Sequence, residues 1–446
     1  MKTKPGILRL LFFMLFTLTL NSSVYAVSKD SNDDSALWGD YLSEEVTVTL
    51  EAKPGMKVEI EHSFGNIEIR KGQNSRVLLQ GEKRVSARNE DIAREYLDNI
   101  ELIAETRGNR ITIRTRYPDN RFFDEQRNNI NNFSLSYTLE IPENTSLEIE
   151  NSFGNINLNS LSGDFAISNR HGKITAVDLT GDTVLENKFG SLSSERINGE
   201  AVISNEHGSI KCTGVTKELL IEGSFGSVEV FDVGADAEIS NKHGSLTVEK
   251  VAGNAALENA FESLDCKNIG GTAVIRNSHG KVTVRDVNND VTVNSSFGKI
   301  DATEIKGDFK AVDQHASVEA INISGNIDIE TSFGSVNVDD IGGSIEVVNQ
   351  HGSITATNIL NRTTDSKKRV NLRTSNSSIR LSLPETVSAT VTASTSQGKI
   401  SCDFPILMNL RDNNSENMLE RFSGTIGDGK DIIILENSQG SIRIEK

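Results

Sequence analysis

The chain has 446 residues, with 63 Asp and Glu against 46 Lys and Arg, so its formal net charge is −17 at pH 7. Proteins that bind nucleic acid or anionic membrane surfaces need a basic footprint, and this charge balance argues against both partners. Aromatic residues make up 5% of the chain, with a single Trp, so a conventional aromatic core is excluded as well.

Residues 1–26 have the composition of a secretory signal peptide. Lys2 and Lys4 precede an apolar stretch at 7–20, and small residues end the segment at Ala26. That stretch is too short to favour a permanent membrane span. We expect a cleaved leader, a flexible segment at 27–44 and no transmembrane span in the mature chain. The predicted location is the periplasm, the cell surface or the extracellular space.

Residues 45–146 contain one repeat unit and an insertion. The segment KPGMKVEIEHSFGNIEI, which begins at Lys53, matches IPENTSLEIENSFGNINL, which begins at Ile141, almost position for position. Between them, residues 86–100 carry Ile92, Tyr96 and Ile100 at helical spacing. Residues 111–116 and 133–141 alternate as strands do. We predict a first coil followed by an N-terminal cap made of a short helix and strands.

The main body, residues 147–360, repeats with a period of 18 residues. Phe and His alternate at this spacing without a slip, and a fixed period of this size indicates a stacked solenoid. We therefore expect twelve 18-residue coils. The alternating series consists of Phe153, His171, Phe189, His207, Phe225, His243, Phe261, His279, Phe297, His315, Phe333 and His351.

Within each coil, positions are numbered from this Phe or His as zero. Positions +3 and +8 are aliphatic, +5 is small or medium, and −4 is nearly always Ile, Leu or Val. This alternation predicts one strand near −7 to −3, a second near +2 to +6 and a short third piece around +8. Glycine at +1 and −8 marks two tight corners. The predicted fold is all-β, a single-stranded parallel β-helix, right-handed by the general preference of parallel crossovers.

Residues 361–446 lose the regular pattern. The polar run NRTTDSKKR at 361–369 breaks the register, and three weaker echoes of the repeat follow it. Residues 403–423 carry scattered apolar side chains. We predict irregular C-terminal coils closed by a cap, because an open solenoid end exposes unpaired strand edges.

The repeated histidines are the first candidate for chemistry. Like residues 36 positions apart lie two coils apart, about 9–10 Å by strand spacing, whereas metal ligands must lie about 2 Å from a shared ion. A structural stack of alternating Phe and His rings, inward or at a corner, is the favoured interpretation. A metal site and a pH-dependent loosening of the stack are the alternatives.

Two polar rows accompany the rings. Position −2 is Asn in most coils, where stacked amides can satisfy backbone groups at the turn. Position −7 is acidic in five successive coils, and a Ca²⁺ ion could relieve the repulsion between them. The alternative is a solvated outer row offset by nearby Lys. These weak cation candidates are Asp164, Asp182, Glu200, Glu218 and Asp236.

The three cysteines offer no disulfide by spacing. Cys212 and Cys266 are three repeats apart, about 14 Å in a stack, and a disulfide requires Cα atoms within about 7 Å. We interpret these two as small buried hydrophobic residues, and expect no disulfide from Cys402 either.

The motifs resemble the adhesin-like β-strand-repeat family of unknown function found in exported bacterial proteins. The resemblance is carried by the PG-x-x-V-x-I-x-x-x-x-G-x-I entry, the repeated N-x-x-G-S-I corners and the stretch from Ser378 to Pro384, and it covers most of 45–446. It implies an exported β-helical protein with an adhesion or scaffold role, and it supplies no catalytic residue.

We predict no catalytic residue, cofactor site or metal site. Motifs for acyl transfer, zinc hydrolysis and phosphate binding are absent from the sequence. The expected function is a non-enzymatic scaffold or adhesin-like binding protein that contacts an envelope protein or a carbohydrate. The alternative is a polysaccharide lyase or glycosidase, which would need converging carboxylates in a side groove.

Overall fold

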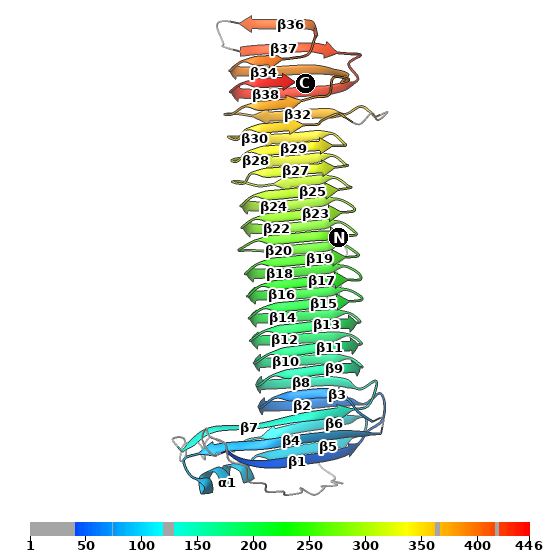
Figure 1. The fold of residues 1–446 in the computed structure, drawn as a ribbon, viewed down its shortest axis with the longest axis vertical. Coiled ribbons are helices and arrows are strands. Elements are labelled where there is room, and N and C mark those ends of the chain that lie inside the picture. Colours follow the sequence, from blue (N-terminus) through cyan, green and yellow to red (C-terminus); the bar gives the residue numbers. More distant parts are fainter. Residues whose placement is uncertain (1–40, 74, 119–128, 362–365, 415–418) are drawn as a thin grey trace.

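The computed structural model describes residues 41–73, 75–118, 129–361, 366–414 and 419–446. The predicted signal peptide and residues 27–40 lie outside the described residues. The described chain is a long column of two parallel-stranded sheets, with one helix, α1, at its N-terminal end (Figure 1). The predicted all-β class is confirmed. Among these residues, no helix combines the length and apolarity needed to cross a membrane.

The column between residues 146 and 357 is built from strands that alternate between two sheets, here named sheet A and sheet B. Sheet B contains β8 (Ser146–Phe153), β10 (Phe165–His171), β12 (Thr183–Phe189), β14 (Ala201–His207), β16 (Leu219–Phe225), β18 (Ala237–His243), β20 (Ala255–Asn259), β22 (Ala273–His279), β24 (Val291–Phe297), β26 (Phe309–Val312), β28 (Ile327–Thr331) and β30 (Ile345–Asn349). Sheet A contains β9 (Ile156–Ser162), β11 (Ile174–Thr180), β13 (Leu192–Asn198), β15 (Ile210–Val215), β17 (Val228–Val233), β19 (Leu246–Val251), β21 (Leu264–Ile269), β23 (Val282–Val287), β25 (Ile300–Ile305), β27 (Val318–Ile323), β29 (Val336–Ile341) and β31 (Ile354–Thr357).

Every strand in this region pairs in parallel with the strand 18 residues further on. In sheet B, Phe165 lies opposite Leu147 on one side and Thr183 on the other. In sheet A, Ile174 lies opposite Ile156 and Leu192. Equivalent repeat positions therefore lie directly over one another along the column.

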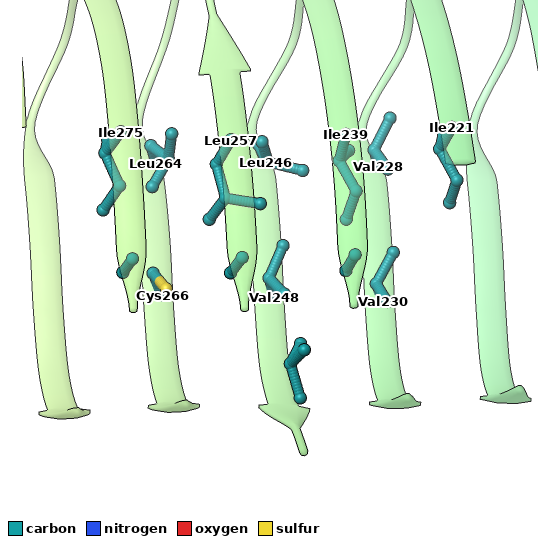
Figure 2. Close-up of a cluster of buried hydrophobic side chains, with 14 of the residues drawn as sticks. Ile221, Val228, Val230, Ile239, Leu246, Val248, Leu257, Leu264, Cys266 and Ile275 are labelled. Carbon is teal, nitrogen blue, oxygen red and sulfur yellow. The ribbon is translucent and has the colours of Figure 1, made fainter. Parts of the chain in front are cut away.

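The core lies between the two sheets and contains the aliphatic positions of the repeat. Figure 2 shows such side chains from neighbouring strands of both sheets, with Val230, Val248 and Cys266 in line. These three residues are at most 3% exposed. One continuous buried cluster runs from Ala52 to Ile444. Each coil alone would bury little, and stacking removes the apolar surface from water.

The predicted third strand piece at +8 is wrong, because it belongs to the second strand. One strand, such as β11, runs from +3 to +9, and the residue at +7 has a positive φ: Ser160 at 56°, Asp178 at 56° and Gly214 at 73°. This left-handed residue shifts the side-chain alternation by one, so +5 and +8 both point inward. Non-glycine residues such as Asn and Asp occupy most of these positions, which is why the sequence gave no sign of the bend.

The +1 corner requires glycine because the coils approach each other closely there. At Gly208 (φ 131°), an added Cβ would lie 2.2 Å from the carbonyl oxygen of Gly190. Two coils have Glu262 or Ala316 at this position instead. Their strands end early, β20 at Asn259 and β26 at Val312, because the backbone must depart from the ladder to make room for a Cβ.

The N-terminal end contains β1 (Tyr41–Glu51), β2 (Lys57–Phe64), β3 (Ile67–Lys71), β4 (Arg76–Ala87), α1 (Glu90–Asp98), β5 (Glu101–Arg107), β6 (Arg110–Arg116) and β7 (Ile130–Ile141). The early coil, β2 and β3, pairs directly with β8 and β9. The insertion continues below it, with β6 beside β2 and β7 beside β3. Residues 41–44 are not a flexible segment as expected, because β1 pairs with β4 along its whole length.

The predicted cap helix is α1, and it covers the end of the core. Asn89 caps its N-terminus by accepting a hydrogen bond from the Ile92 backbone N–H at 2.9 Å, and Ala93, Tyr96 and Leu97 form its buried face. The structure adds β1, β4 and β5, which the sequence analysis did not identify.

The C-terminal end contains β32 (Arg369–Thr374), β33 (Ile379–Ser382), β34 (Ala389–Gln397), β35 (Ile400–Cys402), β36 (Leu407–Asn414), β37 (Leu419–Ile426), β38 (Asp431–Gln439) and β39 (Ile442–Glu445). The last coil is not at the end of the column, since β38 lies between β32 and β34 and pairs in parallel with both. The hairpin β36–β37 continues sheet B beyond β34 (Figure 1). It coincides with the segment predicted as the cap.

Candidate interaction surface along the aromatic ladder

The alternating Phe and His rings form one continuous stack along the column. Adjacent ring centroids lie 4.5–5.2 Å apart, with interplanar angles of at most 19°. The stack continues one ring further than predicted, because Phe64 of β2 stacks on Phe153 at 5.1 Å. We call this row of rings, Phe64 to His351, the aromatic ladder.

The ladder lies on the outside of the column, at the corner where sheet B turns into sheet A. Its six phenylalanines within the regular coils are 40–48% exposed. Because each ring covers the faces of its neighbours, the exposed part is the ring edge. Stacking of a sugar or a base needs a free aromatic face, so the ladder presents instead a strip of C–H and imidazole edges.

The ends of the ladder are closed by other side chains. At the N-terminal end, Tyr117 and Phe133 contact the Phe64 ring edge-on, with centroids at 5.2 and 4.8 Å. At the other end, the Nδ1 atom of His351 lies 2.6 Å from the side-chain amide of Asn376, which takes the next ladder position. The terminal rings therefore have polar or aromatic partners rather than an open face.

A column of buried Asn side chains supports the ladder from inside, as the sequence analysis predicted. Asn205 is 2% exposed, and its Nδ2 donates to the carbonyl oxygens of Gly190 at 2.9 Å and Gly208 at 3.0 Å. The bond to Gly190 crosses to the preceding coil and the other lies within the same corner. The amide thus fixes the two turns that place neighbouring rings over each other.

The early coil has His62 in this slot. Its Nδ1 lies 2.9 Å from Thr115 Oγ1, and its ring contacts Tyr137 edge-on at 5.2 Å. Burial lowers the pKa of His62 to about 4, against smaller opposing effects of hydrogen bonds to backbone groups. Burial raises the pKa of Tyr137 as well. The slot is therefore occupied by a neutral imidazole at neutral pH.

The predicted acidic row lies at the opposite corner of the coil, where sheet A returns to sheet B. Its carboxylates are exposed and accept backbone hydrogen bonds from the next coil. Asp164 Oδ1 accepts from the N–H of Asp182 at 3.3 Å, and Asp182 Oδ1 accepts from Glu200 at 3.1 Å. Where the row is not acidic, Asn254 performs the same task for Thr272 at 2.9 Å. The structure thus gives Asp164 and Asp182 a turn-stabilising role that needs no ion.

The two corners carry opposite charge. We define the ladder edge as positions −1 to +2 of the twelve coils and the acid edge as positions +9 to +11. The ladder edge has the acids Glu206 and Glu262 against six basic residues, Arg170, Lys173, Lys188, Lys242, Lys281 and Lys299. The acid edge has the bases Lys217 and Lys306 against seven acids, Asp164, Asp182, Glu200, Glu218, Asp236, Asp290 and Asp308.

The remaining candidates do not form a reactive site. Among the described residues, no group of three or more His, Cys, Asp or Glu side chains is arranged to hold a metal ion. All three cysteines are free thiols. Burial raises the pKa of Cys212 to about 11 and of Cys266 to about 12, so both are unreactive at neutral pH.

One shallow groove brings two carboxyl groups together. It lies along the +7 row and includes Asp286, Glu304 and Lys306. A hydrogen bond from Asp286 raises the pKa of the exposed Glu304 carboxyl. Glycoside hydrolases hold their two carboxyl groups about 5–9.5 Å apart with substrate between them, whereas these two are in direct contact. The groove therefore lacks the geometry that the enzymatic alternative requires.

No model of a known protein family matches the chain, and no curated protein matches it either. Solved structures do. A "putative cell adhesion protein" from Clostridium sporogenes is 11% identical with a TM-score of 0.18, over 91% of this chain and 99% of that one. A "putative adhesin" from Parabacteroides merdae is 9% identical with a TM-score of 0.23, over 68% and 96%. A "putative lipid binding protein" from Parabacteroides distasonis is 12% identical with a TM-score of 0.17, over 68% and 96%. The names of the first two agree with the predicted resemblance to adhesin-like repeat proteins.

Proposed function

We propose that this chain is a non-enzymatic, exported, adhesin-like scaffold that makes contacts through the ladder edge. In this proposal the fold is a right-handed, single-stranded parallel β-helix with 18-residue coils. The cleaved protein acts in the periplasm or outside the cell, and its partner is an envelope protein or a carbohydrate. The acidic row is proposed to remain free of bound cations, in line with its backbone hydrogen bonds.

The observation that carries the proposal is the exposed strip of aromatic edges. Soluble proteins seldom leave large apolar side chains exposed in a contiguous row, and such rows mark interaction surfaces. Phe189, Phe225 and Phe261 are 40%, 48% and 44% exposed and belong to one unbroken stack. The backbone could have carried polar side chains at this corner, as Asn376 does one coil beyond His351.

A binding assay tests this function. Labelled protein is titrated onto isolated envelopes and onto a panel of acidic and neutral polysaccharides, and the same samples are assayed for polysaccharide cleavage. We expect saturable binding without cleavage. The variant Phe189→Ser/Phe225→Ser/Phe261→Ser should lose most of this binding.

The matched control removes exposed apolar side chains away from the ladder. Val184 and Val202 are 37% and 39% exposed on the outer face of sheet B. Val184→Ser/Val202→Ser should bind as the unmodified chain does. Cleavage of any polysaccharide, or equal loss of binding in both variants, would contradict the proposal.

A further inference from the structure

The charged residues of the two edges are paired strand by strand. Strand β10 has Asp164 immediately before its first residue and Arg170 next to its last residue. Strands β12 and β18 repeat this arrangement with Asp182 and Lys188, and with Asp236 and Lys242. An acid at one end of a strand and a base at the other therefore lie at the same height on opposite edges of the column.

The rest of the pattern avoids repulsion with one exception. Beside β24, Asp290 precedes the strand and Lys299 follows it. At β20 the acidic Glu262 of the ladder edge is matched by the neutral Asn254 on the acid edge. Only β14, between Glu200 and Glu206, has an acid at both ends. Shifting the column sideways by its own width would thus place opposite charges face to face.

The groups concerned are available for such a contact. Asp164, Asp182, Asp236, Arg170 and Lys242 are all exposed. The bases Arg170 and Lys242 form no ion pair within the described part of the chain, and neither does the acid Asp236. Asp182 is approached by Lys217 at 4.0 Å, and Lys188 by Glu206 at 3.8 Å, both at the limit of an ion pair.

We propose that this protein associates side by side with further copies of itself, the ladder edge of one copy docking on the acid edge of the next. This inference rests on the proposed function, because it names a second copy of the chain as a partner of the ladder edge. The copies point in the same direction, with equivalent coils at the same height. Because two different edges meet, the contact is heterologous and leaves a free edge on each side, so it produces open rows rather than closed dimers.

A second copy fits this surface better than an irregular partner does. The two edges share one rise per coil, so a match at one coil is repeated at the next without strain. The exposed ring edges of the ladder carry the positive side of the aromatic quadrupole. Carboxylates are the groups expected to approach them, and the acid edge supplies a row of carboxylates.

The test is sedimentation velocity of the purified protein over a range of concentrations, at about 0.1 M and about 0.5 M NaCl, since the higher salt shortens the screening length to a few ångströms. We expect the weight-average sedimentation coefficient to rise with concentration at the lower salt and to fall to the monomer value at the higher. A monomer under all these conditions would overturn the inference.

Two variants then separate the edges. The acid-edge variant is Asp164→Asn/Asp182→Asn/Asp236→Asn, which keeps the side-chain acceptor that Asn254 already provides in this row. The ladder-edge variant is Arg170→Glu/Lys188→Glu/Lys242→Glu. Each should be monomeric alone. Mixed in equal amounts, they should form dimers and nothing larger, because only one intact edge of each kind remains in the mixture.

A charge-matched control distinguishes the edge from the net charge. Glu186→Gln/Glu222→Gln/Glu258→Gln removes the same three charges from the outer face of sheet B and should associate as the unmodified protein does. Association of the acid-edge variant, or a mixture that stays monomeric, would overturn the inference. The assay uses one purified component, so its failure leaves envelope binding, and thus the proposed function, to be judged separately.

Discussion

The regular coils and the N-terminal end use the same two slots with different chemistry. In the regular coils, the inner slot is an Asn that bonds to two turns and the outer slot is a ring whose faces are covered by neighbouring coils. At the N-terminal end, His62 fills the inner slot, and Phe64 is half-buried by Tyr117 and Phe133. Repetition satisfies each interior coil through its neighbours, whereas the last coil needs side chains from an insertion.

The largest effect should come from breaking the close approach of the regular coils. Gly208→Ala places a Cβ 2.2 Å from the carbonyl oxygen of Gly190, at a φ of 131° that only glycine adopts readily. We expect a loss of about 3 kcal/mol or more, measured as a fall in the thermal midpoint. Gly214→Asn is the control, because its nearest neighbouring atom would lie 3.5 Å away and Asn268 has the same left-handed backbone conformation. A small effect at Gly208 would mean that the corner can move.

The pH dependence of His62 sharpens the contrast at the N-terminal end. Its pKa in the folded chain is about 4, below the ordinary value of 6.5, so the unfolded chain binds the additional proton first. Stability is therefore complete above about pH 6.5 and is lost as the pH falls towards 4, by up to about 3 kcal/mol.

The variant His62→Asn, which restores the residue of the regular coils, should remove this part of the pH dependence. The measurement compares urea unfolding of both proteins between pH 7 and pH 4.5, so that contributions shared by the two cancel. Parallel stability curves for the two proteins would show that His62 does not titrate in this window.

The Asn column should show a smaller, local effect. Asn205→Ala leaves the carbonyl oxygens of Gly190 and Gly208 without their side-chain donor, at a cost of about 1–3 kcal/mol. Asn205→Thr should lose less, because Thr331 fills the same slot and donates to Phe333 O at 2.9 Å and Ala316 O at 3.3 Å. Hydrogen exchange of the β14 and β16 amides measures both variants. Equal protection in the Ala variant would assign the corner to the backbone alone.

The smallest effect should come from an ion pair on the sheet A surface. Arg196 lowers the pKa of Asp178 through a side-chain hydrogen bond, yet both groups are fully open to solvent. Exposed pairs contribute little, because water screens the attraction. Arg196→Ala should leave the thermal midpoint unchanged within error, and a clear fall would show that the +7 bend depends on its side chain.

The period of 18 residues and the aliphatic positions allowed much of the fold and of the site to be predicted. Ile174, Ala176 and Leu179 were placed inward, the Phe153 and His171 rings were stacked, and the Asn169 slot was assigned to the turns, all from spacing. The weak points were features that vary in sequence. The left-handed residue at +7 can be Ser, Asp, Arg or Lys, because only its backbone matters.

By itself, the sequence determined that equivalent residues lie over one another, because a fixed period leaves the coils only one register that buries the aliphatic positions. Only the tertiary structure decided that the early coil stacks directly beneath β8, that β38 lies between β32 and β34, and that the ladder faces outward. The physical reason is that parallel strands of similar composition can pair in several orders. The order is selected by how the ends of the core are covered, which depends on contacts between residues far apart in the chain.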